Sequence, residues 1–149
     1  MLTEVERRNK ALVLQMYAEV WNKGNLDFIN QAVSQDFKDH PPKRFAETPA
    51  GGREALVEAV KNFRAAMPDF HDQMIQVTAE GDRVYYLGRM TGTHTAPFLQ
   101  HPASGNKINV LGMSGFRLEN GMVVERWGIY DVMGMMRQMG IVPAAPGAH

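Results

Sequence analysis

The first half of the chain has apolar residues at helical spacing. Over residues 4–22 they recur three or four positions apart, which predicts an amphipathic helix with one buried stripe. The same spacing predicts a short helix over residues 26–33 and a longer one over residues 53–67, which Pro68 ends because proline cannot continue a helix. Helices therefore precede the rest of the fold.

After Pro68 the apolar residues alternate with polar ones, as they do in half-buried strands. Four strands are predicted, over residues 70–80, 83–96, 107–118 and 122–131. The first two are joined at Gly81-Asp82 and the last two at Asn120-Gly121, which is a strong signal for a type I′ hairpin. A short strand over residues 37–40 and a final helix over residues 132–139 complete the pattern. Helices followed by a curved antiparallel sheet predict the α+β class.

The hairpin turns also predict which side chains share a face of the sheet. A two-residue turn at Asn120-Gly121 pairs Ser114 with Trp127 and places Asp131 on their face. A β-bulge would reverse the faces beyond it, and the mid-strand glycines are the candidate positions.

Around the first turn, the same reasoning places Asp72, Met74, Arg89 and Thr91 on one face and Tyr86 on the other. Arg89 could then hold a substrate enolate or carboxylate, as fixed cations do for developing negative charge. The equal alternative is a salt bridge with Asp72 or Glu125.

The chain has 149 residues, which fits one domain over residues 1–149 with a core large enough to enclose a ligand cavity. Sixteen Lys and Arg residues balance sixteen Asp and Glu residues without a run of like charge, so nucleic-acid and membrane partners are not expected. Cysteine is absent, which excludes disulfides and thiolate chemistry. The N-terminus has no apolar signal core, so a cytoplasmic location is expected. Residues 140–149 are expected to be a frayed tail.

Asp131 lies where the last predicted strand meets a methionine-rich helix. A carboxylate beside so much apolar surface should resist ionising, and proton transfer on a small organic molecule requires such a group. The alternative is an ordinary N-cap, in which the side chain accepts hydrogen bonds from the first free amides of the helix. When Asp131 is considered alone, the N-cap is the favoured interpretation.

Three histidines are further candidates. His40 precedes two prolines, and it could share a proton with Asp131 or bind a substrate carbonyl, because histidine titrates near neutral pH. A structural hydrogen bond at the strand end is an equal alternative. His71 and His94 could share a face, but neither a helical i, i+4 pair nor a carboxylate cluster accompanies them, so no metal site is predicted.

Several short segments, in this order, carry a family resemblance. They are Tyr17-Ala18-Glu19-Val20-Trp21-Asn22-Lys23-Gly24-Asn25, Asp39-His40, Met67-Pro68-Asp69-Phe70, Gly81-Asp82-Arg83-Val84, Gly92-Thr93-His94-Thr95, and Gly121 with Glu125-Arg126-Trp127, Asp131 and Met139-Gly140. Over residues 5–140 the chain resembles the SnoaL-like polyketide cyclases (ester cyclases) of the NTF2-like superfamily. The resemblance implies an NTF2-like cone, in which a curved antiparallel sheet wraps around the N-terminal helices and encloses a pocket. It also implies homodimers that pack through the outer face of the sheet.

The resemblance implies a chemistry as well. Members with known activity close a polyketide ring by intramolecular aldol condensation, with an aspartate as general acid and base and no metal or organic cofactor. That aspartate is carried over to Asp131. The limonene-epoxide hydrolases, on the same fold, use an Arg-x-Asp pair and a second aspartate, but here Arg89-Met90-Thr91 has threonine where the paired aspartate would stand. Epoxide hydrolysis is therefore disfavoured.

Two hypotheses follow. The first is a cofactor-independent enzyme that moves a proton on a small hydrophobic carbonyl compound, in an aldol cyclisation or an isomerisation, with Asp131, His40 and Arg89 as catalytic residues. The second is a non-catalytic binding or accessory protein for a small molecule. In both, the expected pocket-lining residues are Tyr17, Trp21, Phe63, Met74, Thr91, His94, Trp127 and Met133.

Overall fold

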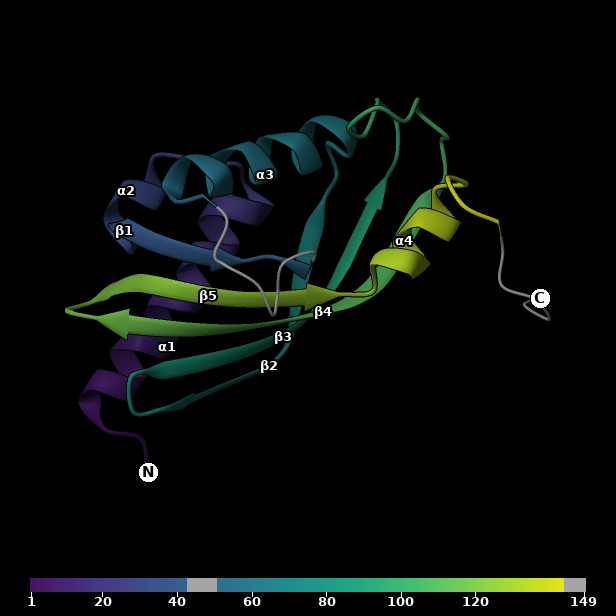
Figure 1. The fold of residues 1–149 in the computed structure, drawn as a ribbon. Helices are drawn as coiled ribbons and strands as arrows, with labels where there is room; N and C mark the ends of the chain where they lie inside the picture. Colours follow the sequence, from purple (N-terminus) through teal and green to yellow (C-terminus); the bar gives the residue numbers. More distant parts are fainter. Residues whose placement is uncertain (43–50, 144–149) are drawn as a thin grey trace.

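The computed structural model describes residues 1–42 and 51–143 of the chain (Figure 1). Its helices are α1 (Glu4–Met16), η1 (Tyr17–Asn22), α2 (Phe28–Ala32), α3 (Arg53–Ala66) and α4 (Val132–Gln138). Its strands are β1 (Val33–His40), β2 (His71–Glu80), β3 (Arg83–Thr93), β4 (Lys107–Glu119) and β5 (Met122–Tyr130). Every predicted helix and strand is present, and β1 is longer than expected. Most of the predicted tail lies outside the described residues.

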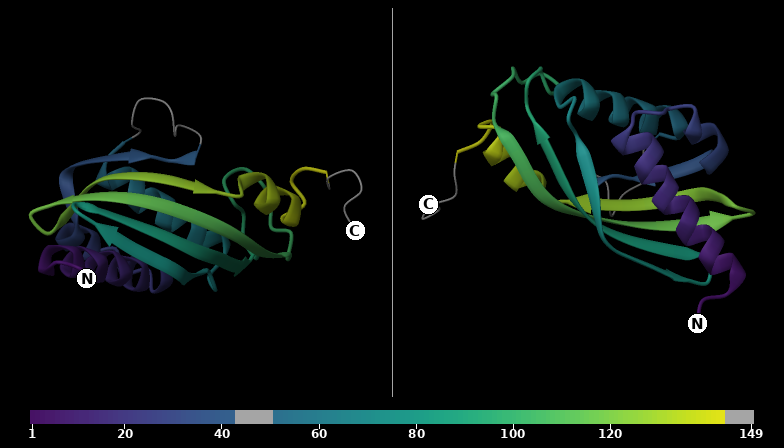
Figure 2. Two further views of the ribbon diagram at one scale, coloured as in Figure 1. Left: turned by 90° about the horizontal axis from the view of Figure 1, so that it is seen from below. Right: turned by 180° about the vertical axis from the view of Figure 1, so that it is seen from behind.

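All five strands form one sheet, in the order β1-β5-β4-β3-β2. Helices α1, α2 and α3 lie against one face of this curved sheet, and α4 continues from the end of β5 (Figures 1 and 2). The predicted α+β class and the wrapping of a sheet around N-terminal helices are confirmed. The prediction of a wholly antiparallel sheet is wrong at one edge, because β1 pairs parallel to β5. These strands are far apart in the sequence, so no hairpin turn forces them to run antiparallel.

The first predicted helix changes type near its end. It starts at a capping box, in which the side chains of Thr3 and Glu6 each accept a hydrogen bond from the other's backbone N–H. From Tyr17 to Asn22 the chain forms a π-helix, a wider turn that is rare and frequently marks functional sites. The last residues of the apolar stripe therefore follow the period of a π-helix, whereas the prediction from the sequence assumes the α-helical period throughout.

The predicted hairpin between β4 and β5 is present, but its register changes along the strands. Asn120 and Gly121 have φ angles of 50° and 76°, as a type I′ turn requires. A bulge then adds a residue to β5, so that Ser114 pairs with Gly128 instead of Trp127. Trp127 consequently lies on the face opposite to the predicted one.

A second bulge interrupts β2 at Ile75. Beyond it, Asp72 pairs with Met90 instead of Thr91. Because side chains alternate between the faces of a strand, the slip brings Asp72 to the inner face, where Tyr86 lies. Arg89 and Thr91 alternate with the inward-facing positions and so lie on the outer face.

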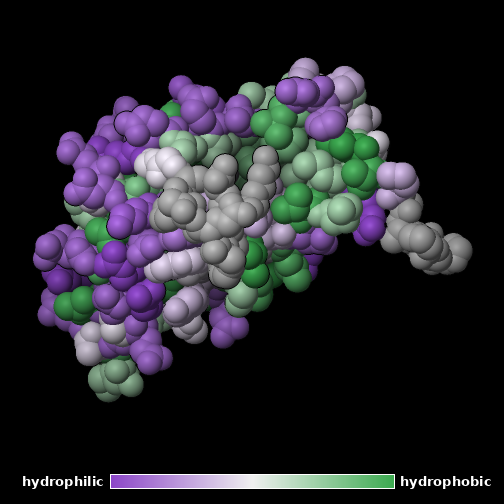
Figure 3. Space-filling model, viewed as in Figure 1, coloured by the Kyte–Doolittle hydropathy of each residue, from purple (hydrophilic) through white to green (hydrophobic). Residues whose placement is uncertain are grey.

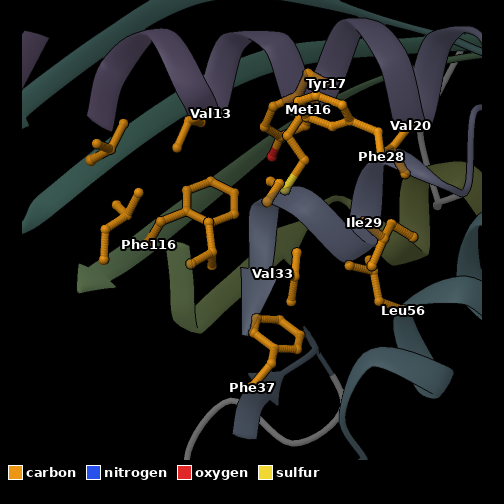
Figure 4. Packing of buried hydrophobic residues seen from close by; sticks show 14 of the residues in the cluster. Val13, Met16, Tyr17, Val20, Phe28, Ile29, Val33, Phe37, Leu56 and Phe116 are labelled. Atoms are coloured by element: carbon orange, nitrogen blue, oxygen red, sulfur yellow. The ribbon is translucent and has the colours of Figure 1, made fainter. Parts of the chain in front are cut away.

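Two clusters of buried apolar side chains hold the helices on the sheet. Figure 4 labels ten members of the larger one: Val13, Met16, Tyr17, Val20, Phe28, Ile29, Val33, Phe37, Leu56 and Phe116. The smaller cluster lies toward α4 and is rich in methionine, with Met67, Met90, Met135 and Met139 among its members. Trp21 packs against both clusters, and it also lines the cavity that forms the candidate site.

Candidate functional site

A cavity of about 330 Å³ lies between the helices and the inner face of the sheet. That volume suits a small organic ligand, because such pockets measure roughly 300 to 1,000 Å³. Six polar residues form one part of its wall: Tyr17, Asp39, Asp72, Tyr86, Ser114 and Arg126. The rest of the wall is mostly apolar. On the surface in Figure 3, hydrophobic residues gather toward the α4 end of the molecule, while the opposite end is mainly polar.

Asp72 enters the cavity from β2 because the bulge at Ile75 turns its side chain inward. Gly88 on β3 provides the space for it, since a Cβ at this position would overlap the Asp72 carboxylate. The hydroxyl of Tyr86 donates a hydrogen bond to Oδ1 of Asp72 over 3.0 Å. The carboxylate is thus held in a fixed place on an otherwise largely apolar wall.

Burial controls the ionisation of Asp72. It raises the pKa of the carboxyl from an ordinary 3.8 to about 6, against the opposing effects of the Tyr86 hydrogen bond and of His71 and Arg126. Such a group is mostly ionised at neutral pH, yet it is a stronger base than an exposed aspartate. Asp72 is therefore suited to taking a proton from a weak acid and returning it.

Tyr17 and Tyr86 form a stacked pair beside this carboxylate. Their ring centroids are 3.7 Å apart, and the ring planes differ by 6°. Burial raises the pKa of Tyr17 to about 12 and also raises the pKa of Tyr86. Figure 4 shows the Tyr17 oxygen directed away from the helix that carries it. Since Tyr86 already donates to Asp72, Tyr17 is the protonated phenol that can donate to a ligand oxygen.

A buried ion pair completes the polar part of the wall. Nη1 of Arg126 on β5 lies 2.9 Å from Oδ1 of Asp39 on β1, with exposed side-chain fractions of 17% and 10%. Burial disfavours the charge on Arg126, but Asp39 and nearby Tyr17 outweigh this effect and raise its pKa. Gly128 leaves the space for the guanidinium, because a Cβ there would overlap it. The pair places a fixed positive charge near Tyr17 and leaves the pair itself neutral.

Aromatic rings shape the apolar part of the wall. Phe63 makes edge-to-face contacts with Trp21, Phe70, Phe98 and Tyr130, at centroid distances of 5.2 to 6.1 Å. Such contacts favour one relative arrangement of the rings. The cavity can therefore hold a flat hydrophobic ligand and present one of its polar atoms to Asp72 and Tyr17.

The predicted lining residues divide into two groups. Tyr17, Trp21 and Phe63 line the cavity. The others lie elsewhere: Met74, Thr91, His94, Trp127 and Met133. Met74 and Met133 are exposed, and His94 is buried against Ser104, whose hydroxyl lies 2.9 Å from its Nδ1. The bulge in β5 accounts for Trp127, which lies beyond it, whereas Thr91 lies on the outer face because it alternates with Tyr86 and Met90 along the unbroken strand β3.

Asp131 does not enter the cavity, and the expectation that it projects into an apolar environment is wrong. Its side chain is exposed and caps α4, with Oδ1 accepting a hydrogen bond from the Gly134 N–H over 2.8 Å. The ordinary N-cap that the sequence also allowed is what forms. β5 ends at Tyr130, so the strand no longer directs Asp131 to either face.

His40 lies on the opposite side of the sheet from the cavity-lining Asp39. Its Nε2 lies 2.8 Å from Oε2 of Glu125, and its ring stacks on Trp127 with centroids 5.2 Å apart. The structure therefore supports the structural role that the sequence left open for His40. It brings His40 together with Glu125 and not with Asp131.

Arg89 also lies apart from the cavity. Its Nη1 donates to Oδ1 of Asn109 over 2.7 Å, in place of the salt bridge with Asp72 or Glu125 that the sequence also allowed. The three predicted catalytic residues, Asp131, His40 and Arg89, are thus not brought together.

The sequence reasoning missed Asp72, Tyr86, Asp39, Ser114 and Arg126 as a group. The one signal that could have found them is the pair of mid-strand glycines, Gly88 and Gly128, because each leaves room for a polar side chain of the site. In residues 1–42 and 51–143, no three His, Asp or Glu side chains are placed to hold a metal ion.

The role of Gly88 gives a first prediction. Gly88→Ala should displace the Asp72 carboxylate from Tyr86 toward water and lower its pKa by about one unit or more. Carbon-13 NMR titration of the carboxyl measures this. Gly115→Ala is the matched control, since a Cβ there meets only the ring of Tyr85. An unchanged Asp72 titration in Gly88→Ala would contradict the assignment.

Comparisons with known proteins agree with the fold. No curated protein sequence matches the chain. A candidate SnoaL-like polyketide cyclase from Jannaschia sp. CCS1 is 25% identical, with a TM-score of 0.85 and coverage of 96% of this chain and 99% of its own. The candidate polyketide cyclase IdmH from Streptomyces antibioticus is also 25% identical, with a TM-score of 0.77 and coverage of 89% and 98%. AclR from Streptomyces galilaeus, a candidate hydroxylase, is 25% identical, with a TM-score of 0.83 and coverage of 95% and 87%.

These likenesses confirm the NTF2-like fold that the sequence resemblance implied. The family model of the SnoaL-like polyketide cyclases matches residues 11–139, which is most of the chain. The protein therefore belongs to the SnoaL-like polyketide cyclase family.

Proposed function

We propose that this protein is an acid/base enzyme that moves a proton on a small hydrophobic carbonyl compound, with Asp72 as the proton carrier. The observation that carries the proposal is a carboxyl with a raised pKa, hydrogen-bonded by Tyr86, in an otherwise largely apolar cavity. Family membership supports the same class of reaction, a cyclisation or isomerisation. The role that the sequence resemblance gave to Asp131 thereby passes to Asp72.

The proposed reaction begins with a C–H bond next to the substrate carbonyl. The Asp72 carboxylate takes this proton, and the electron pair of the bond moves to the carbonyl oxygen, which becomes an enolate. Tyr17 donates a hydrogen bond to that oxygen, and the nearby charge of Arg126 stabilises it further. These groups are fixed before the substrate binds, so little reorganisation is needed during the step.

In a cyclase, the enolate carbon then attacks a second carbonyl of the same molecule. A carbon–carbon bond forms, and the resulting alkoxide takes the proton from Asp72, which regenerates the carboxylate. In an isomerase, Asp72 would return the proton to a different carbon. Both versions use only side chains of this protein, and both need a substrate with one apolar end for the aromatic wall around Phe63.

A second candidate is a protein that binds a hydrophobic molecule without transforming it. The predominantly apolar wall favours this reading, because it can hold a ligand whether or not Asp72 acts on it. Binding and proton transfer can be separated with a simple bicyclic ketone.

The test uses 2-tetralone, which has an acidic C–H bond beside its carbonyl. In heavy water, the protein should accelerate the exchange of that hydrogen for deuterium above the buffer rate by about tenfold or more, because a positioned base contributes to proton transfer. Proton NMR follows the loss of signal, and titration of protein intrinsic fluorescence measures binding. Saturable binding with exchange at the buffer rate would favour the non-catalytic candidate.

We also propose that the chain forms a homodimer through the outer face of the sheet. Tyr85, Leu111, Met113 and Ile129 lie together there and are 45% to 49% exposed, so this face carries apolar surface that a second copy can cover.

Sedimentation equilibrium should therefore give a dimer of the 16.7 kDa chain at micromolar concentration. Met113→Glu should convert it to a monomer, because a charge would be buried in the interface. Val5→Glu is the matched control, as Val5 is an exposed apolar residue of α1, which lies against the opposite face of the sheet. A wild-type monomer would contradict the proposal.

Within the described residues no helix is long and apolar enough to span a membrane, and a cytoplasmic location stays a prediction.

A further inference from the structure

Asn22, the last residue of the π-helix η1, forms two hydrogen bonds with the main chain of Asp72, fifty positions further along the chain. Its Oδ1 accepts from the Asp72 N–H over 2.7 Å, and its Nδ2 donates to the Asp72 carbonyl over 3.1 Å. A side-chain amide carries an acceptor oxygen and a donor NH₂ side by side, so it can satisfy a backbone donor and a backbone acceptor at once.

The position of β2 explains why Asp72 needs such a partner. β2 is an edge strand, so one side of it has no neighbouring strand to pair with. The amide of Asn22 satisfies both main-chain groups of Asp72 in place of a strand. The bulge at Ile75 lies only three residues away, and a slip of one residue there would turn Asp72 to the outer face.

Asn22 is itself held by a second residue. Nη1 of Arg64 on α3 donates to the carbonyl oxygens of Trp21 over 2.8 Å, Asn22 over 3.0 Å and Phe70 over 3.3 Å. The guanidinium therefore ties the end of η1 to the residues that lead into β2. The π-helix, the start of β2 and the Asp72 carboxylate form one connected frame.

We propose that Asn22 is a positioning residue for Asp72, which fixes the register of the edge strand and so directs the carboxylate into the cavity. This inference rests on the proposed function of Asp72. Asn22 is absent from the cavity wall, so it acts through Asp72 and not on the substrate.

The test compares Asn22→Ala with wild type in the 2-tetralone exchange reaction and in the carbon-13 NMR titration of Asp72. Without the amide, the carboxylate should spend more time outside the cavity. We expect the maximal exchange rate to fall about tenfold or more, with the half-saturating ketone concentration within about threefold. The titration midpoint of Asp72 should fall by about half a pH unit or more, because the group becomes more hydrated.

Asn109→Ala is the control, since Asn109 is an asparagine that bonds Arg89 and does not contact Asp72. If Asn22→Ala does not fold, Asn22→Ser decides the question, because its hydroxyl is neutral and can keep one of the two hydrogen bonds to the Asp72 main chain. It should lose less rate than Asn22→Ala, and the Asp72 midpoint should still fall below that of wild type. A purely structural role would leave the midpoint in place.

The inference and the proposed function can fail separately. A folded Asn22 variant with an unchanged Asp72 midpoint would overturn the positioning role, whatever its rate. Equal exchange rates in wild type and Asp72→Asn would overturn the proposed function. In that case the NMR titration would still decide whether Asn22 positions the carboxylate.

Discussion

Replacing Asp72 with asparagine should slow the exchange of the 2-tetralone hydrogen by about two to four orders of magnitude, or to the buffer rate if that limit is reached first. Asparagine keeps the shape of the side chain and can accept the hydrogen bond from Tyr86, but it cannot take a proton. Binding of the ketone should change little, because the aromatic wall is untouched.

Asp131→Asn is the matched control. It makes the same chemical change in an aspartate that caps α4 and lies outside the cavity. Asparagine is also a good N-cap, so both the fold and the exchange rate should be preserved. If Asp131→Asn lost the rate and Asp72→Asn kept it, the catalytic assignment would return to the residue that the sequence resemblance favoured.

The same Asp72 variant should show a pH-dependent gain in stability. The folded-state pKa of about 6 lies above the ordinary 3.8, so the folded protein binds a proton more tightly than the unfolded chain does. This contribution to stability is fully present below about pH 4 and is lost as the pH rises through about 6, a loss on the order of 3 kcal/mol. Above about pH 6, Asp72→Asn should therefore melt at a higher temperature than wild type. A lower melting temperature at about pH 8 would show that the ionised carboxylate stabilises the fold.

The second large effect should come from the buried ion pair. Arg126→Met should lower the free energy of unfolding by about 3 to 5 kcal/mol at neutral pH, because it leaves Asp39 buried without its partner. The double variant Asp39→Asn/Arg126→Met should recover much of this loss, since no buried charge remains unpaired.

Urea denaturation measures these free energies. Lys61→Met is the control, because Lys61 and Glu58 form an exposed pair whose atoms are 3.8 Å apart, and such pairs contribute about 0 to 1 kcal/mol. A loss in Arg126→Met no larger than that of Lys61→Met would show that water already compensates Asp39 in the open cavity.

The elements of this fold could be predicted from the sequence because each has a strong local signal. The period of the apolar residues located the helices, and Asn120-Gly121 located a hairpin tip with the required positive φ angles. The parallel pairing of β1 with β5 has no such signal, since these two strands are far apart in the sequence and no turn connects them. A single domain over residues 1–149 stays a prediction.

The candidate site was harder to predict because it depends on two bulges. One extra residue at Ile75 reverses the faces of β2, and one in β5 moves Trp127 to the outer face. The predicted register of each hairpin is correct between the turn and the bulge, and it is wrong beyond the bulge. Asp72 lies beyond the bulge in β2. Alternation alone cannot locate an inserted residue, because both registers are consistent with the same turn.

The pH dependence of 2-tetralone exchange tests the assignment of Asp72 most directly. If Asp72 is the base, the rate should rise with pH to a plateau, with a midpoint of about 6 that matches the carboxyl, and Asp72→Asn should lack this transition. A rate that shows no transition between about pH 5 and 7, or the same transition in Asp72→Asn, would contradict it.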